Sequence, residues 1–406
     1  MILPATKLNS TIKTISQKRG KPFFDVDFWS GEILTALPKM TNKLIPSSKV
    51  AVFFSKATYQ THAKQLTEKF KQNGNSIISV VMPDDFEDSL ANYSEIFNLA
   101  EDVRLIVTLD EKFYSISKYF ATIRQIDCLL VVRNLNCYGI LAPEITIKKD
   151  ECLEEVKISA KGHILFDYND IKKSTNSLAN AYAFIVSHTL ALVDYRINAF
   201  LTGVEVEKNA YYLASQAIIN TYSIFSLKKE EFFNLLVENF FNIELANLFS
   251  YNNFYKSFSS RFVAKQGDFN DYSASLLKTS TLIAKIYNLL CSDKYDKLLE
   301  YPDYLSRADF ISKRLNLSHA CVNSIIVKNC KTIESKYAKG VQFLKNAQKD
   351  VNSFVNCSNT MLNTFTVLGG NVSQSQEDFG QLIKHSGDLT LNGMTLVRES
   401  GITELM

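Results

Sequence analysis

Glycine and proline are scarce in this chain of 406 residues, which has only 14 glycines and 7 prolines. Both counts lie well below the usual shares of about 7% and about 5%. Phosphate-binding loops and nucleophile elbows need glycines at fixed spacing, because the backbone there turns sharply or approaches a ligand closely. The patterns G-x-G-x-x-G, G-x-x-x-x-G-K-[ST] and G-x-S-x-G do not occur. The sequence therefore lacks the motifs of the commonest nucleotide-binding and hydrolase sites.

The spacing typical of metal ligands is also missing. Seven cysteines include no C-x-x-C pair, and no two of the five histidines stand three or four residues apart. No histidine pair can therefore share one helical face, as zinc ligands on a helix do. We expect the cysteines to be small buried residues in a reducing compartment.

The charges are nearly balanced, with 45 Lys plus Arg against 42 Asp plus Glu. A net charge of +3 gives no strong field for nucleic acid, and we expect no nucleic-acid partner. The first 20 residues lack a continuous apolar core, and no window approaches the roughly 18 apolar residues of a membrane span. We therefore expect a cytoplasmic protein with no membrane association.

The first part of the chain has the pattern of a parallel α/β domain. Short apolar, β-branched runs at 49–54, 76–82, 104–109 and 127–132 are separated by stretches with helical periodicity. Strands that are apolar throughout are typical of a sheet covered by helices on both faces. The pattern predicts a doubly wound, Rossmann-like α/β domain over residues 1–165.

The second part has a different hydrophobic pattern. Apolar residues recur three and four positions apart, as in Leu178, Ala181, Tyr182 and Ile185, and breakers are few. We expect no strand after residue 174. The pattern predicts an all-α domain over residues 166–406.

The order of these segments resembles the dehydroquinate synthase and iron-containing alcohol dehydrogenase superfamily, and most closely its glycerol-1-phosphate dehydrogenase branch. RLIVTLDEKFYSISKYFA (104–121) and LVVRNLNCYGILAPEITI (130–147) are similar to its dinucleotide loop and the following strand, and Lys118 and Gly139 are retained. NAYAFIVSHTLALVDYRINAFLTG (180–203) and SSRFVAKQGDFNDY (259–272) resemble its metal-binding segments. The resemblance implies a nucleotide-binding α/β domain, a helical domain and a metal between them.

The dinucleotide loop departs from the family pattern. Leu109, Asp110 and Glu111 stand where the resemblance has three glycines, and Lys112 stands where it has a serine. Side chains with a Cβ hinder the close approach of backbone N–H groups to a pyrophosphate, and two carboxylates repel it. Together with Lys118, these residues form a degenerate cofactor-binding loop.

The metal-binding positions depart as well. Phe184 aligns with the family's aspartate ligand, Asp268 with its first histidine ligand and Tyr272 with another histidine of that segment. A phenyl ring cannot ligate zinc, and one carboxylate does not make a tetrahedral site. We therefore expect neither NAD(P) nor zinc as a cofactor.

Three hypotheses for the function follow. The first is a non-catalytic homologue, a pseudoenzyme that acts as an interaction or regulatory protein with an unknown protein partner. The second is an NAD(P)- and zinc-dependent oxidoreductase acting on glycerol phosphate or another polyol. The third is a metal-free protein or enzyme that binds a small anionic metabolite in the cleft between the domains. The candidate anion-binding residues for that cleft are Lys112, Lys118, Arg133, Tyr138, Arg261 and Lys265. A homo-oligomer is compatible with each hypothesis.

Overall fold

Two compact units make up the protein, Met1–Ser177 and Leu178–Met406. The structure is a computed structural model. It describes residues 4–19, 26–96, 99, 101–135, 139–174, 176–223, 229–250, 257–266, 272–292, 303–371, 379–400 and 402–405. The nucleotide-binding role that the sequence suggests for the first unit stays a prediction.

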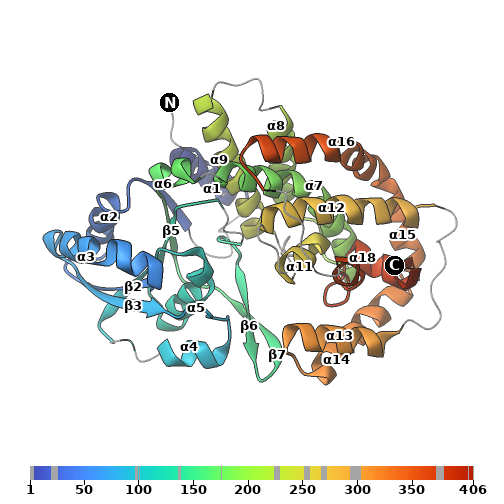
Figure 1. The fold of residues 1–406 in the computed structure, drawn as a ribbon, viewed down its shortest axis with the longest axis horizontal. Helices are drawn as coiled ribbons and strands as arrows, with labels where there is room; N and C mark the ends of the chain where they lie inside the picture. The colour runs from blue at the N-terminus through green and yellow to red at the C-terminus, as the bar shows by residue number, and fades with distance from the viewer. Residues whose placement is uncertain are drawn as a thin grey trace. The chain divides into compact units, whose positions relative to one another are not determined.

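The first unit is built on a six-stranded parallel sheet (Figure 1). Its strands are β1 (Val26–Ser30), β2 (Lys49–Ser55), β3 (Ser76–Met82), β4 (Val103–Thr108), β5 (Asp127–Val132) and β8 (Gly162–Phe166). They lie in the order β1-β8-β5-β4-β2-β3. The four apolar runs of the sequence correspond to β2, β3, β4 and β5, and the predicted α/β fold class is confirmed.

The segment between β5 and the second unit is richer in strands than the sequence suggested. Residues 150–173 contain two strands that were not among the four predicted apolar runs, β7 (Cys152–Lys157) and β8. β7 pairs antiparallel with β6 (Glu144–Lys149) in a separate hairpin. Its tight turn places Asp150 and Glu151 at φ 46° and 60°. The turn carries no glycine, so its sequence gives no hairpin signal.

Helices surround the sheet, and α1, α3 and α5 pack directly on its strands (Figure 1). They are α1 (Pro4–Arg19), α2 (Ala36–Leu44), α3 (Lys56–Gln72), α4 (Leu90–Ile96), the short 3₁₀-helix η1 (Glu111–Phe113), α5 (Tyr114–Arg124) and α6 (Tyr168–Lys173). The chain passes from β2 to β3 in one direction along the sheet and from β4 to β5 in the other. With right-handed crossovers, α3 and α5 therefore cover opposite faces.

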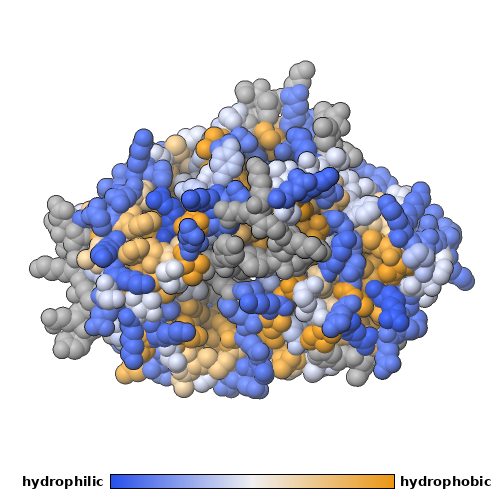
Figure 2. Space-filling model, turned by 180° about the vertical axis from the view of Figure 1, so that it is seen from behind, coloured by the Kyte–Doolittle hydropathy of each residue, from blue (hydrophilic) through white to orange (hydrophobic). Residues whose placement is uncertain are grey.

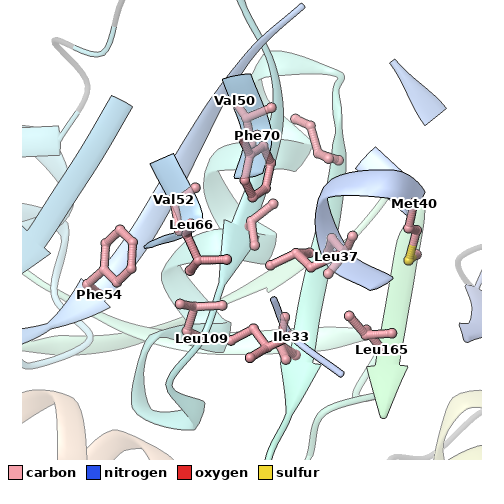
Figure 3. Packing of buried hydrophobic residues seen from close by; sticks show 14 of the residues in the cluster. Ile33, Leu37, Met40, Val50, Val52, Phe54, Leu66, Phe70, Leu109 and Leu165 are labelled. Carbon is pink, nitrogen blue, oxygen red and sulfur yellow. The ribbon is translucent and has the colours of Figure 1, made fainter. Parts of the chain in front are cut away.

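The core of the first unit lies between α2, α3 and one face of the sheet (Figure 3). Leu66 and Phe70 of α3 lie one turn apart and are fully buried against Val50 and Val52 of β2. Ser55 caps this helix, because its hydroxyl accepts a hydrogen bond from the backbone N–H of Thr58 at 3.2 Å. This packing and the Ser55 cap together fix α3 on β2.

The described residues of the second unit form helices joined by loops, with no strand among them. Its elements are α7 (Ser177–Thr202), α8 (Lys208–Tyr222), α9 (Lys229–Phe249), α11 (Ser259–Gln266), α12 (Tyr272–Leu290), α13 (Tyr304–Leu315), α14 (His319–Glu334), α15 (Tyr337–Asn346), α16 (Gln348–Val367), α17 (Phe379–Lys384), α18 (Gly393–Glu399) and η4 (Ile402–Leu405). The predicted all-α class is confirmed.

A buried charged cluster joins the last helices of the second unit. The Asp388 carboxylate is fully buried and accepts hydrogen bonds from Arg307 and Arg398, each at 3.1 Å. His385 contacts its second oxygen at 2.6 Å through Nδ1. Two cations around one carboxylate compensate its buried charge, so the cluster links α13, α17 and α18.

Hydrophilic side chains are spread over the face seen in Figure 2, with hydrophobic residues between them. Among the described helices, not one combines the length and the apolar character needed to cross a membrane.

Candidate functional site

The strand order identifies where a ligand would bind in the first unit. Strand β2 lies between β3 and β4, so the chain changes its direction of progress across the sheet at this point. Open α/β sheets bind ligands in the crevice at the carboxyl ends of the strands beside such a reversal. In this chain, Ser55 at the end of β2 and residues 109–111 after β4 line that position.

Asp110 lies at this reversal. Its Oδ2 accepts a hydrogen bond from the Ser55 backbone N–H at 2.7 Å, and its Oδ1 accepts one from the Thr58 hydroxyl at 2.7 Å. Ser55 is the N-cap of α3, and Thr58 lies in its first turn. Free N–H groups and the helix dipole make the start of a helix attractive to anions. The helix dipole therefore stabilises the Asp110 carboxylate beside the N-cap of α3.

The neighbours of Asp110 anchor this loop. Leu109 is 1% exposed and packs in the core beside Ile33 (Figure 3). Glu111 accepts hydrogen bonds from the Asn134 amide at 3.1 Å to each carboxylate oxygen, and burial raises the pKa of Glu111. Lys112 points its ammonium to the Asp84 carbonyl at 3.3 Å. Each residue of the altered loop thus contacts the protein itself.

Lys118 is a buried structural cation. It is only 2% exposed, and its Nζ donates to the carbonyl oxygens of Gly139 at 3.1 Å, Ile140 at 3.4 Å and Ala142 at 3.2 Å. Gly139 adopts φ 78°, a left-handed conformation that favours glycine. Lys118 and Gly139, both retained from the family pattern, therefore hold one loop in place.

Arg133 follows β5 and is paired with an acid of α6. Its Nε donates to Asp170 Oδ2 at 2.7 Å, and Nη2 lies 3.1 Å from His62 Nε2. Both members of the Arg133–Asp170 pair are about one quarter exposed, at 25% and 27%. Burial and the Arg133 charge lower the pKa of His62. The charge of Arg133 is thus compensated on one side by a carboxylate.

Comparison with solved structures identifies the fold. An archaeal alcohol dehydrogenase from a Red Sea brine pool is 12% identical with a TM-score of 0.56, covering 93% of this chain and 96% of its own. The iron-containing alcohol dehydrogenase of Thermotoga maritima is 9% identical with a TM-score of 0.53, covering 95% of this chain and 99% of its own. The glycerol dehydrogenase of Schizosaccharomyces pombe is 12% identical with a TM-score of 0.50, covering 88% of this chain and 96% of its own.

This chain has the iron-containing alcohol dehydrogenase fold. The likeness extends over both units, and it confirms the fold that the motif order implied. No protein-family model matches the sequence. No curated protein matches it either. At these identities the likeness establishes the dehydrogenase fold alone, so the chemistry depends on the residues present.

The residues of this dehydrogenase fold do not fit a metal at the predicted position. Phe184 on α7 is 1% exposed and packs against His188 at 4.3 Å and Phe240 at 4.8 Å between ring centroids. His188 Nδ1 lies 2.7 Å from the Phe184 carbonyl oxygen, and burial lowers the pKa of His188 to about 4. Within the described residues, no group of three or more His, Cys, Asp or Glu side chains is placed to hold a metal ion.

A buried carboxylate lies further along the same helix of the dehydrogenase fold. Asp194 accepts hydrogen bonds from the Ser259 backbone at 2.9 Å, the Ser259 hydroxyl at 2.7 Å, the Tyr287 hydroxyl and the Gly393 backbone at 3.1 Å. Burial raises the pKa of Asp194 to about 6. Asp194 therefore joins α7 to the first residues of α11 and α18 and to α12, a structural role.

Several candidate residues are only partly described. Tyr138 and Asp268 lie outside the described residues, and Lys265 belongs to α11 without a described side chain. Arg261 hydrogen-bonds Tyr272, and burial raises the pKa of Tyr272 to about 12. These positions belong to two units, so their convergence in one cleft stays a prediction.

Sequence reasoning missed the partners of the candidate residues. Ser55, Asn134 and Asp170 bind Asp110, Glu111 and Arg133. Each partner lies 23 or more residues away in the sequence. These partners could have been predicted only from the rule that the carboxyl ends of parallel strands meet at one edge of the sheet.

Proposed function

We propose that this protein is a non-catalytic member of the dehydrogenase fold, an interaction or regulatory protein that has lost dinucleotide chemistry. The observation that carries the proposal is the Asp110 carboxylate at the first turn of α3, within 2.7 Å of both Ser55 N and Thr58 Oγ1. A pyrophosphate there would have to displace a carboxylate and face its charge. The repulsion between the Asp110 carboxylate and a pyrophosphate weakens binding of the cofactor itself, whatever the reaction.

The packing around Phe184 supports the proposal independently. A metal-dependent dehydrogenase needs a charged, ligating side chain at its metal, whereas this position is filled by hydrocarbon in contact with Phe240. Insertion of an ion next to the phenyl ring would leave the ion's charge without ligands in a buried environment. Two independent sites thus disfavour the ancestral reaction.

The other two hypotheses have less support. The oxidoreductase would need a mobile loop at residues 109–111 and metal ligands in place of Phe184. The anion-binding protein would need free cations, whereas Lys118 donates to three carbonyl groups and Arg133 is paired with Asp170.

A dehydrogenase assay with metal analysis tests the proposal. Purified full-length protein is analysed for bound metal, then incubated with Zn²⁺ or Fe²⁺, either NAD⁺ or NADP⁺, and a panel of polyols and their phosphates. The proposal predicts substoichiometric metal and no formation of reduced nucleotide. One equivalent of bound metal together with turnover of any polyol would overturn it and favour the oxidoreductase.

A further inference from the structure

The two edges of the six-stranded sheet differ. At the β1 edge, the Asn9 side chain of α1 binds both backbone groups of Phe28, accepting from its N–H at 2.9 Å and donating to its C=O at 2.8 Å. The Asn9 amide therefore satisfies the Phe28 N–H and C=O groups to which another strand would bind. β3, at the other edge, has β2 as its only strand neighbour in the described sheet.

Strand β3 presents unpaired backbone groups outward. The Ser76 N–H donates to the Ser48 carbonyl oxygen, on the side of β2, at 3.3 Å. Along a strand, the backbone N–H and C=O groups of successive residues point alternately to the two sides. The N–H and C=O groups of Ile77, Ser79 and Val81 therefore point away from β2. Within the described residues, none of these groups has a hydrogen-bond partner. Ser79 is exposed, and Val81 is 46% exposed.

The sequence of β3 also lacks the usual protection of an edge strand. Soluble proteins commonly place lysine, proline or a bulge on such an edge to prevent strand pairing. SIISVVM contains no charged residue and no proline, and its seven residues pair with β2 without interruption. The edge is therefore suited to accept another strand along its whole length.

We propose that β3 is a self-association surface, where it pairs antiparallel with β3 of a second copy of this chain. A two-fold axis at Ser79 brings the outward groups into register, because Ser79 then meets Ser79 and Ile77 meets Val81 of the copy. Such an interface is isologous, with the same patch on both partners. The absence of charge in β3 means that no like charges face each other across the axis.

Charges beside the strand favour a second copy over an unrelated strand. Lys69 and Lys71 are exposed in the last turn of α3, just before β3, and Asp84 and Asp85 are exposed just after it. An antiparallel two-fold arrangement places the start of one β3 beside the end of the other. The lysines of each copy then approach the aspartates of its partner at both ends of the interface, and this favours pairing.

The proposal is independent of whether the protein is catalytic. Its test is the molar mass of the full chain by light scattering and sedimentation over a wide concentration range, for the parent and three variants. Ser79→Pro removes an outward donor and leaves the β2 hydrogen bonds intact, since proline is tolerated at such edge positions. Ser79→Lys places two ammonium groups opposite each other, and Ile123→Lys adds the same charge to an exposed position on α5.

The parent and Ile123→Lys proteins are expected to form dimers. Ser79→Pro and Ser79→Lys are expected to weaken the dimer by about tenfold or more, since each affects hydrogen-bonded or charged groups at the two-fold axis. Circular dichroism checks that the variants are folded. A parent that is monomeric at every concentration, or a dimer that both Ser79 variants leave unchanged, would overturn the proposal.

A charge exchange adds a second, milder test. Asp84→Lys with Asp85→Lys should weaken the dimer, and adding Lys69→Glu with Lys71→Glu to the same chain should restore it. If the dimer of the quadruple variant is as weak as that of the double variant, the lysines and aspartates do not meet across the interface and the proposed two-fold arrangement is wrong.

Discussion

Asp110 and Ser55 join two neighbouring strand ends. The Asp110 carboxylate, just after β4, accepts a hydrogen bond from the Ser55 backbone N–H at the end of β2, at 2.7 Å. This contact crosses the point where the sheet reverses its direction of winding. In a protein that binds a dinucleotide, an anionic group of the ligand would compete for the same donors. Asp110 thus joins the end of β4 to the end of β2 and the start of α3.

Replacement of Asp110 by alanine should destabilise the protein. The change leaves the Ser55 N–H and the Thr58 hydroxyl without their acceptor and removes a negative charge from the start of α3. We expect a loss of about 1–2 kcal/mol in the free energy of unfolding, as for other lost helix caps. Urea denaturation measures it, with the exposed Glu101→Ala as control. Equal stability of Asp110→Ala and the parent would contradict the described contact.

Replacement of Lys118 by methionine should have a larger effect. Methionine keeps much of the length of the side chain but leaves the carbonyl groups of Gly139, Ile140 and Ala142 without their shared donor. We expect a loss of about 2–4 kcal/mol, because buried acceptors that lose a charged donor are costly. If Lys118→Met instead unfolds at the same urea concentration as the parent, this lysine is not the structural link that we describe.

Replacement of Phe184 by aspartate tests the former metal position. The change removes the contacts with His188 and Phe240 and buries a carboxylate among aromatic rings. We expect a loss of about 3–5 kcal/mol, typical of a core aromatic residue. Addition of zinc should not restore the stability, because the described residues supply no ligand set. Phe184→Leu is the control and should lose less. A Phe184→Asp protein that zinc stabilises would revive the metal-dependent enzyme.

His188 should make stability depend on pH. Burial lowers its pKa from 6.5 to about 4, so between these values the unfolded chain binds a proton that the folded protein does not. This contribution to stability is therefore present above pH 6.5 and is lost as the pH falls toward 4. It amounts to about 3 kcal/mol at most, at 1.36 kcal/mol for each pKa unit.

The variant His188→Phe isolates this effect. Its free energy of unfolding, subtracted from that of the parent, should leave a difference that rises with pH between 4 and 6.5. The pKa of Asp194 is raised to about 6, so its contribution to the free energy of unfolding falls as the pH rises. This contribution is the same in both proteins and cancels in the difference. A difference that does not change with pH would show that His188 titrates normally.

The sequence predicted four strands of the parallel sheet and the helical second unit. Strands β2, β4 and β5 were visible because buried parallel strands are apolar almost throughout, and β3 was visible because its run is apolar although it is partly exposed. β7 was missed because its CLEEVK segment is largely exposed and polar. β1 was missed because VDFWS is short and partly exposed. The helical second unit followed from its apolar periodicity.

The candidate site was less predictable. The substitutions at Leu109, Asp110 and Glu111 indicated a loss of cofactor binding, but not that Asp110 would bind the start of α3. That contact depends on the strand order, which brings residues 55 positions apart together. Lys118 was assigned to the cofactor loop, whereas its three carbonyl partners follow from a loop conformation that the sequence does not encode locally.

Dinucleotide titration measures whether the point of strand-order reversal still binds a cofactor. NADH and NADPH are titrated into the parent protein by calorimetry, with the Lys112→Ala variant as control. We expect no saturable binding to either protein, because the loop at residues 109–111 carries side chains and two carboxylates where a pyrophosphate would need close backbone contact, and Asp110 is bound to Ser55 and Thr58. Saturable binding at micromolar concentration to the parent, lost in Lys112→Ala, would contradict it and show that the reversal point of the sheet still accepts a cofactor.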